Sequence, residues 1–265
     1  MSDRGKQIDA SANYWLHGKG PLRVIVLHGW FVGSEVFEPM LAALDPERFS
    51  LAFIDYRGYG AALMADGPYD IETIAIDVAS IADRLGWSRF AVVGHSMGGK
   101  AALRVAVDMG SRVTQILALT PVFAGPAPFG REQVALFRSA ASDLAARAAI
   151  LNHSTGGLLP ASWSNRMAAK SFETSREQAF AAYFESWAFS DFSKEVEALP
   201  QEVLAVSGEH DAGVTEEAVK ASWIAKLPNA RLKRISGSGH YPMLETPLKL
   251  AAIFEEFLRS LETSS

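Results

Sequence analysis

Short apolar runs recur along the chain and alternate with longer segments whose apolar residues follow helical spacing. Five runs are almost continuously apolar and rich in Val, Ile and Leu: Leu22–Leu27, Leu51–Ile54, Phe90–Val93, Val113–Leu119 and Val203–Val206. Such runs are typical of strands that are buried on both faces of a parallel sheet. A more polar run at Arg231–Ile235 predicts a strand nearer an edge, and Asn13–Leu16 predicts an earlier antiparallel strand.

The segments between these runs predict helices. Ile71–Leu85 has apolar residues at helical spacing and is followed by Gly86, which favours the end of a helix. Gly98–Met109 and Leu248–Leu261 show the same spacing. The alternation of strands with helices predicts a fold of the α/β class with a doubly wound, mostly parallel sheet.

One stretch, residues 123–200, departs from this alternation. It starts with a Pro- and Gly-rich segment and continues into Ala-rich helical patterns at 131–151 and 176–189, which a loop at 152–160 separates. We therefore expect a core domain of residues 1–122 and 201–265, and an insertion of mostly helical character at residues 123–200. The insertion either covers a functional site as a cap or packs as extra helices at one edge of the sheet.

A candidate nucleophile lies between two of the predicted elements. Gly94-His95-Ser96-Met97-Gly98 matches the pattern Gly-x-Ser-x-Gly, with the strand Phe90–Val93 before it and the helix Gly98–Met109 after it. A sharp turn from strand to helix lifts the serine out of the sheet, so we predict Ser96 as the nucleophile. The amide N–H of Met97 would stabilise developing negative charge, helped by the helix dipole. An ordinary turn containing a serine is the alternative.

A serine hydroxyl needs a general base and an acid that orients it. His240 follows the last predicted strand in a Gly-rich loop, and we predict it as the base. In this arrangement the chain order is serine, acid, histidine. Glu209 and Asp211 both follow Val203–Val206; we favour Asp211 because it lies deeper in the loop, and Glu209 is the alternative.

The segment after Leu22–Leu27 has the sequence His28-Gly29-Trp30-Phe31. A second donor to the oxyanion should come from this loop, and we predict the amide N–H of Trp30. Its side chain is expected to form a wall of the pocket, with plain core packing as the alternative. Lys100, just after the nucleophile turn, is expected at the surface, solvated or in an ion pair.

Composition narrows the choice of partners. The 265 residues are 49% hydrophobic and 21% charged and include no cysteine, which excludes disulfides, thiolate metal sites and a cysteine nucleophile. A net charge of −5 argues against nucleic acid as a partner. With no signal-peptide pattern and no apolar run long enough for a membrane span, we expect a cytoplasmic protein with a small-molecule substrate. The oligomeric state stays open.

Five segments carry a resemblance to a known family: VIVLHGWF, FIDYRGYG, VVGHSMGG, VSGEHDAGVT and SGSGHYPMLETP, in this order. Together they closely resemble the α/β-hydrolase family over nearly the whole chain, and in particular its serine-nucleophile, capped members such as small bacterial carboxylesterases. The resemblance implies an acyl-enzyme mechanism with no cofactor and no metal, and a cap over the site. Phe31, Phe123, Trp187 and Tyr241 are then expected to border the substrate pocket.

The resemblance implies hydrolysis of a carboxylic ester, or a lactone, of a small to medium, partly apolar substrate. Ser96 argues against dehalogenase and epoxide hydrolase activity, since such relatives use an aspartate at this position. Carbon–carbon bond hydrolysis or perhydrolysis on the same triad is one alternative. A receptor that keeps the fold to sense a ligand is the other.

Overall fold

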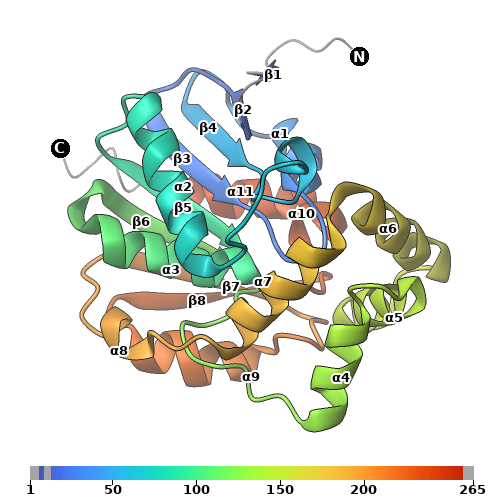
Figure 1. Ribbon diagram of the computed structural model, residues 1–265. Coiled ribbons are helices and arrows are strands. Elements are labelled where there is room, and N and C mark those ends of the chain that lie inside the picture. The colour runs from blue at the N-terminus through green and yellow to red at the C-terminus, as the bar shows by residue number, and fades with distance from the viewer. Residues whose placement is uncertain (1–5, 9–12, 259–265) are drawn as a thin grey trace.

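Eight strands of the described residues form one sheet in the order β1-β2-β4-β3-β5-β6-β7-β8. The structure is a computed structural model that describes residues 6–8 and 13–258 (Figure 1). The strands are β1 (Lys6–Ile8), β2 (Tyr14–His17), β3 (Leu22–Leu27), β4 (Phe49–Ile54), β5 (Phe90–His95), β6 (Val113–Leu119), β7 (Glu202–Gly208) and β8 (Ala230–Ile235). All pairs from β4 to β8 are parallel, whereas β1–β2 and β2–β4 are antiparallel. The predicted doubly wound, mostly parallel sheet is confirmed.

The predicted strands agree with the sheet in position and in burial. Val24–Leu27 in β3 and all of β5 are buried, as expected for strands covered on both faces. The more polar run at Arg231–Ile235 belongs to β8 at the edge of the sheet, and Asn13–Leu16 largely coincides with the antiparallel strand β2. The sequence patterns did not predict β1.

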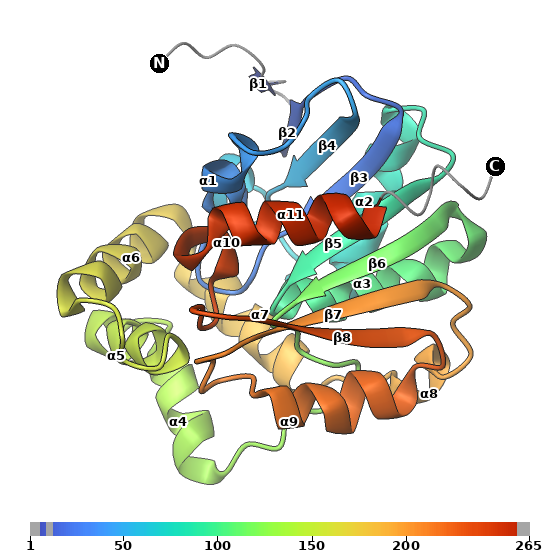
Figure 2. The same cartoon turned by 180° about the vertical axis from the view of Figure 1, so that it is seen from behind.

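Helices cover both faces of the sheet: α2 and α3 lie on one face and α11 lies on the other (Figures 1 and 2). The helices outside residues 123–200 are α1 (Glu38–Leu41), α2 (Ile71–Arg84), α3 (Met97–Met109), α9 (Glu216–Val219), α10 (Pro242–Glu245) and α11 (Pro247–Leu258). The predicted helix Leu248–Leu261 corresponds to α11, and its last three residues lie outside the described residues. The Asp70 carboxylate caps α2 by accepting a hydrogen bond from the Thr73 amide at 2.7 Å.

Residues 123–200, the predicted insertion, lie between β6 and β7 and contain helices without a strand. Its helices are α4 (Arg131–Ser139), α5 (Leu144–Ser154), α6 (Ala161–Thr174), α7 (Glu177–Phe189) and α8 (Ser193–Val196). The pattern at 131–151 predicted one continuous helical stretch, but the structure has two helices there. The chain breaks because the Asp143 carboxylate accepts hydrogen bonds from the amides of Ala145 and Ala146 and so starts α5 anew.

The strand order decides which loops come together. From β3 the chain passes first to β4 on one side and then to β5 on the other, which makes a crevice at the carboxyl ends of these strands. The segments that follow β3, β5, β6, β7 and β8 therefore lie in a row along one edge of the sheet. Helices α4, α5 and α6 of the insertion lie beyond this same edge, whereas α8 lies beside α3 (Figures 1 and 2).

Candidate active site

Ser96 occupies the turn between β5 and α3 in a strained backbone conformation. Its φ of 54° lies in the left-handed region, which a residue other than glycine rarely adopts. A Cβ atom on Gly94 would lie 2.1 Å from the Gly98 carbonyl oxygen, and one on Gly98 would lie 2.6 Å from the His28 carbonyl oxygen. The two glycines are therefore required by close packing around the turn that presents Ser96.

Asp211 and His240 come together from the loops after β7 and β8. The imidazole Nδ1 of His240 donates to Asp211 Oδ2 at 2.7 Å, and both side chains are buried. The other carboxylate oxygen, Oδ1, accepts hydrogen bonds from the amides of Gly213 at 2.9 Å and Val214 at 2.8 Å. The loop thus leaves one oxygen of Asp211 for the histidine and holds the carboxylate in place through the other.

Glu209, the alternative acid, lies elsewhere. Its carboxylate accepts hydrogen bonds from Arg234 at 2.8 Å and from the Gly237 amide at 2.9 Å. The Gly237 amide and the Arg234 guanidinium hold the pKa of Glu209 below its ordinary value. The structure therefore brings Asp211, and not Glu209, to His240.

The backbone of His240 is bonded to His95, the residue before Ser96, and to Thr120, the residue after β6. Its carbonyl oxygen accepts hydrogen bonds from His95 Nε2 at 2.8 Å and from Thr120 Oγ1 at 2.9 Å. Burial lowers the pKa of His95 well below its ordinary value, so this ring is neutral. Within the described residues no hydrogen bond joins Ser96 Oγ to the His240 imidazole. Such contacts often tighten only when substrate is bound.

Glu245 holds the loop on either side of His240. Its carboxylate accepts hydrogen bonds from the amides of Gly239 at 2.7 Å and Tyr241 at 2.8 Å. Burial raises the pKa of this carboxyl above its ordinary value. Glu245 and Thr120 were not identified from the sequence, because their partners are backbone groups that leave no spacing pattern.

The loop after β3 lies directly against Ser96. A Cβ atom built on Gly29 would lie 2.6 Å from His95 Nδ1 and 3.4 Å from Ser96 Cβ. Met97 is the first residue of α3, so its amide has no acceptor within the helix. Among the described residues, the amides of Trp30 and Met97 donate to no other group. These two amides are the predicted oxyanion donors.

The predicted pocket residues divide into three places. Trp30, Phe31 and Trp187 belong to an aromatic cluster between the core and the insertion, whose other members are Phe129, Phe137, Phe180 and Phe184. The indole Nε1 of Trp30 donates to the Phe180 carbonyl oxygen at 2.8 Å. The Tyr241 ring contacts the rings of His95 and His240, with centroid distances of 5.2 and 5.3 Å. Phe123 instead packs against Trp223 at 5.9 Å and contacts no ring of the aromatic cluster.

Lys100 is not a surface residue, so that prediction was wrong. Its side chain is fully buried, and Nζ donates to the carbonyl oxygens of Gly125 at 3.1 Å, Trp187 at 3.0 Å and Ser190 at 2.7 Å. Burial lowers its pKa to about 8. The lysine joins α3, which begins directly after Ser96, to both ends of the insertion.

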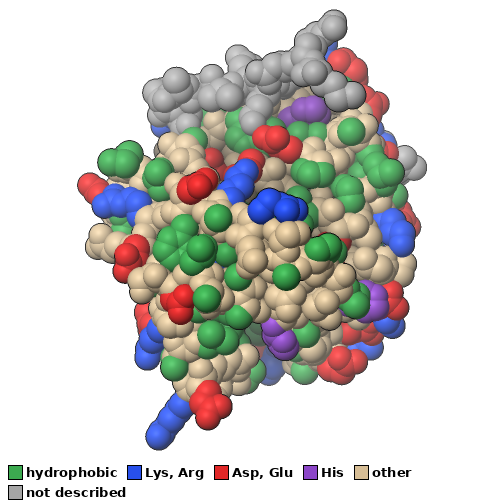
Figure 3. Space-filling model, turned by 90° about the vertical axis from the view of Figure 1, so that its right-hand side faces the viewer, with side chains coloured by type: hydrophobic (Ala, Val, Ile, Leu, Met, Phe, Trp, Pro, Cys, Tyr) green, Lys and Arg blue, Asp and Glu red, His purple; other side chains and the backbone are tan. Residues whose placement is uncertain are grey.

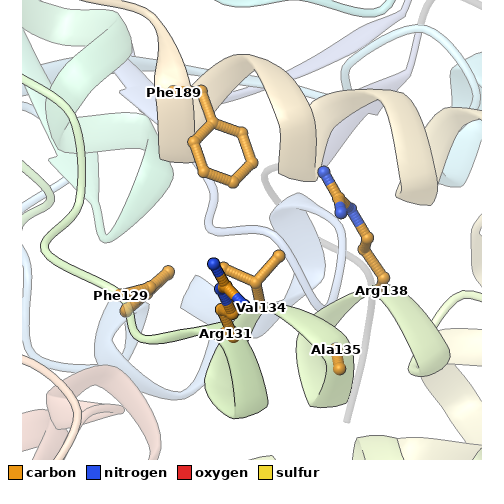
Figure 4. Close-up of a pocket in the computed structure, with 6 residues that line it drawn as sticks. All are labelled: Phe129, Arg131, Val134, Ala135, Arg138 and Phe189. Carbon is orange, nitrogen blue, oxygen red and sulfur yellow. The ribbon is translucent and has the colours of Figure 1, made fainter.

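A hollow of about 470 Å³ lies between α4 and the carboxyl end of α7, and Figure 4 shows the side chains around it. It is lined by Phe129, Arg131, Val134, Ala135, Arg138 and Phe189. None of these is a predicted site residue. Phe129 contacts Phe137 at 4.9 Å, and Phe137 stacks on Trp30 at 5.6 Å, so one ring lies between the hollow and the loop after β3.

The surface and the polar clusters add little to this site. On the face in Figure 3, acidic, basic and apolar side chains are interspersed rather than gathered by kind. Within residues 6–8 and 13–258, no group of three or more His, Asp or Glu side chains is placed to hold a metal ion. No helix in the same part of the chain has the length and apolar character needed to cross a membrane.

Comparison with known proteins gives matches over most of the chain. The sequence profile of the alpha/beta hydrolase family matches residues 24–253. A pimeloyl-acyl-carrier-protein methyl ester esterase of Nitrosomonas europaea is 29% identical over 93% of this chain and 99% of its own length. A proposed carbamate hydrolase of Caulobacter segnis is 28% identical over 82% of this chain and 84% of its own. The solved structure of a hydrolase from Oleispira antarctica superposes with a TM-score of 0.84, at 19% identity and 94% coverage of both chains.

Proposed function

We propose that this chain, which belongs to the alpha/beta hydrolase family, is a serine esterase that cleaves a carboxylic ester or lactone through an acyl-enzyme intermediate. The observation that carries the proposal is the 2.7 Å hydrogen bond between His240 and Asp211 at the sheet edge where Ser96 is presented. A buried carboxylate that fixes one imidazole nitrogen leaves the other free to accept a proton. The ester hydrolase named among the relatives supports the same chemistry.

In the first half of the reaction, His240 Nε2 accepts the proton of the Ser96 hydroxyl while Oγ attacks the ester carbonyl carbon. The carbonyl oxygen becomes an oxyanion, which the amides of Trp30 and Met97 stabilise by hydrogen bonding. When the tetrahedral intermediate collapses, the bond to the alkoxy oxygen breaks. The proton on His240 goes to this oxygen, and the alcohol leaves.

In the second half, a water molecule replaces the alcohol. His240 takes one proton from the water as the water oxygen attacks the acyl carbon. It gives that proton to Ser96 Oγ when the bond between Oγ and the acyl carbon breaks. The sum is ester plus water giving acid plus alcohol. Asp211 stays ionised throughout and stabilises the positive charge that His240 carries in each half.

The insertion at residues 123–200 is the proposed cap, with residues 1–122 and 201–265 as the core domain. Support comes from its aromatic side chains, which reach the loop after β3 at Trp30. Apolar rings favour an acyl group that is at least partly apolar, because burying such a group removes apolar surface from water. A small to medium, partly apolar ester or lactone is the substrate class that we propose.

Hydrolysis of p-nitrophenyl acetate and p-nitrophenyl butyrate by wild type and Ser96→Ala tests the proposal. We expect turnover by the wild type and a fall of about 10⁶-fold in kcat for Ser96→Ala, the scale seen when a nucleophile of this kind is removed. Ser207→Ala is the matched control, since it removes a hydroxyl from a buried serine of β7 that has no hydrogen-bond partner.

Three outcomes would contradict the proposal. Equal activity of Ser96→Ala and wild type would show that Ser96 is not the nucleophile. Turnover of a vinylogous diketone with none of an ester would favour carbon–carbon bond hydrolysis instead. Binding of a small ligand without any turnover would favour a receptor.

A further inference from the structure

Three consecutive carbonyl groups of the loop after β3 each accept a hydrogen bond from a different buried side chain. The Tyr56 hydroxyl donates to the His28 carbonyl at 2.8 Å, and the Tyr59 hydroxyl donates to the Trp30 carbonyl at 2.7 Å. The His28 imidazole donates through Nδ1 to the Gly29 carbonyl at 2.6 Å. Loop carbonyls more often face water, so a complete set of buried donors is unusual.

The protonation of His28 follows from its second contact. The Tyr56 amide donates to His28 Nε2 at 3.2 Å, so Nε2 is the acceptor and Nδ1 carries the proton. Burial lowers the pKa of this imidazole, which keeps it neutral in the buried loop. The ring also lies against Tyr56 with a centroid distance of 3.8 Å. His28 is thus a fixed donor to Gly29.

The three hydrogen bonds determine where the loop amides point. In a trans peptide the carbonyl of one residue and the N–H of the next point in opposite directions. Holding the Gly29 carbonyl therefore directs the Trp30 N–H to the other side, and holding the His28 and Trp30 carbonyls fixes the two neighbouring peptides. Ser96 adjoins this loop, with its Cβ 3.4 Å from the position of a Cβ on Gly29.

The two tyrosines are themselves fixed by the loop that follows β4. The carboxylate of Asp55 accepts hydrogen bonds from the Ser34 amide at 2.7 Å and from the Ala61 amide at 2.9 Å. One side chain thereby joins the loop after β3 to the loop that carries Tyr56 and Tyr59. Both tyrosines also contact the Tyr183 ring of the insertion, at 5.9 and 5.7 Å.

We infer that His28, Tyr56 and Tyr59 are positioning residues that hold the Trp30 amide toward the oxyanion of the reaction. This inference rests on the proposed esterase function. Donors that are already aligned need no reorganisation when negative charge develops, so losing the alignment slows the chemical step more than it weakens substrate binding. None of the three side chains needs to touch the substrate.

The test compares Tyr59→Phe and Tyr56→Phe with wild type in the hydrolysis of p-nitrophenyl butyrate. Each substitution removes one hydroxyl and keeps the ring. Tyr69→Phe is the matched control, because Tyr69 is a buried tyrosine that contacts the same Tyr183 ring but donates to Ala65, outside the loop. Butylboronic acid is the second probe, since its tetrahedral adduct with Ser96 places an oxygen where the oxyanion forms.

For Tyr59→Phe and Tyr56→Phe we expect kcat to fall about 10-fold, less than the roughly 10²- to 10³-fold cost of deleting an oxyanion donor. KM should change less than about twofold, and the inhibition constant of butylboronic acid should rise in parallel with the loss of kcat. Tyr69→Phe should match wild type in all three quantities.

Equal kcat in Tyr59→Phe, Tyr56→Phe and the Tyr69→Phe control would overturn the inference. So would a loss of kcat without a loss of boronate affinity, because a purely structural role predicts that result. If one variant fails to fold in a thermal unfolding measurement, the other decides. A wild type that does not hydrolyse the ester would overturn the proposed function itself, which is a distinct result.

Discussion

At the scale of single residues, Asp211 divides its two oxygens between different tasks. Oδ1 binds two amides of its own loop, and Oδ2 accepts the hydrogen bond from His240. The first set of contacts holds the carboxylate rigidly, and rigidity lets the second contact select one tautomer and one orientation of the imidazole. Glu209 binds Arg234 and a backbone amide instead, and so has no such task at His240.

Asp211→Asn should reduce kcat by up to about 10⁴-fold, because an amide can donate to the imidazole and favour the wrong tautomer. Glu209→Gln is the matched control, a change of the same kind in the same loop, and should alter kcat less than about threefold. Steady-state rates on p-nitrophenyl butyrate measure both. A larger loss for Glu209→Gln than for Asp211→Asn would show that the acid is assigned to the wrong residue.

At the scale of elements, two buried cations organise the insertion. The Arg147 guanidinium lies between the rings of Phe172 and Phe180, 3.9 and 3.6 Å from their centroids. It donates to two carbonyl oxygens in the turn between α4 and α5, and to the hydroxyls of Ser171 and Ser175. Burial lowers its pKa to about 10. Arg147 therefore joins α5 to α6 and α7 through hydrogen bonds and ring contacts rather than an ion pair.

Lys100 acts between elements, because it joins α3 to the two ends of the insertion through three carbonyl oxygens. Its pKa falls from 10.5 to about 8 on folding. Between these two values the unfolded chain binds more protons at this lysine than the folded protein does. The free energy of unfolding that Lys100 contributes therefore rises with pH across this window.

Denaturant unfolding of wild type and Lys100→Met at several pH values from 7.5 to about 10.5 measures this contribution, and the difference removes the titration of all other groups. The stability of wild type relative to Lys100→Met should increase across the window by up to about 3 kcal/mol. A constant difference would contradict the lowered pKa. Lys194→Met is the control, since it removes a lysine of the insertion that is exposed and not buried.

At the scale of the whole molecule, the aromatic cluster is the contact through which the insertion meets the predicted oxyanion loop. Trp30 stacks on Phe180 at 4.1 Å and on Phe137 at 5.6 Å, and both rings belong to the insertion. Phe137 lies on α4, none of whose residues is buried. On the other side of Phe137, Phe129 lines the hollow in Figure 4.

Phe137→Ala should therefore extend the space around Trp30 toward the hollow. We expect kcat/KM for p-nitrophenyl octanoate to rise relative to p-nitrophenyl acetate by about 10-fold, the gain from burying roughly two more methylenes at about 0.8 kcal/mol each. Val134→Ala, which changes the lining of the hollow without touching a ring on Trp30, should leave the ratio unchanged. The same ratio in all three proteins would show that Phe137 does not limit acyl length.

The sequence by itself determined much of the core and the candidate residues of the site. Strands buried on both faces and helices with one apolar face have distinct periods, which are local properties of the chain. The turn at Ser96 is also local, because the two glycines that allow it lie within two residues of the serine. The spacing of apolar residues did not predict β1 or the break between α4 and α5. Both depend on contacts or helix caps, which have no repeating pattern in the sequence.

Only the tertiary structure decided which groups meet. Asp211 and Glu209 are two residues apart, and their roles separate only through the direction of each side chain. Lys100 lies 90 residues from Ser190, and Tyr59 lies 29 residues from Trp30, so neither contact has a signature in sequence spacing. Asp211, Lys100 and Tyr59 are buried, and a buried polar group without a partner costs free energy, which favours a partner wherever the fold supplies one. The fold decides which partner each group meets, and the order of residues alone does not show it.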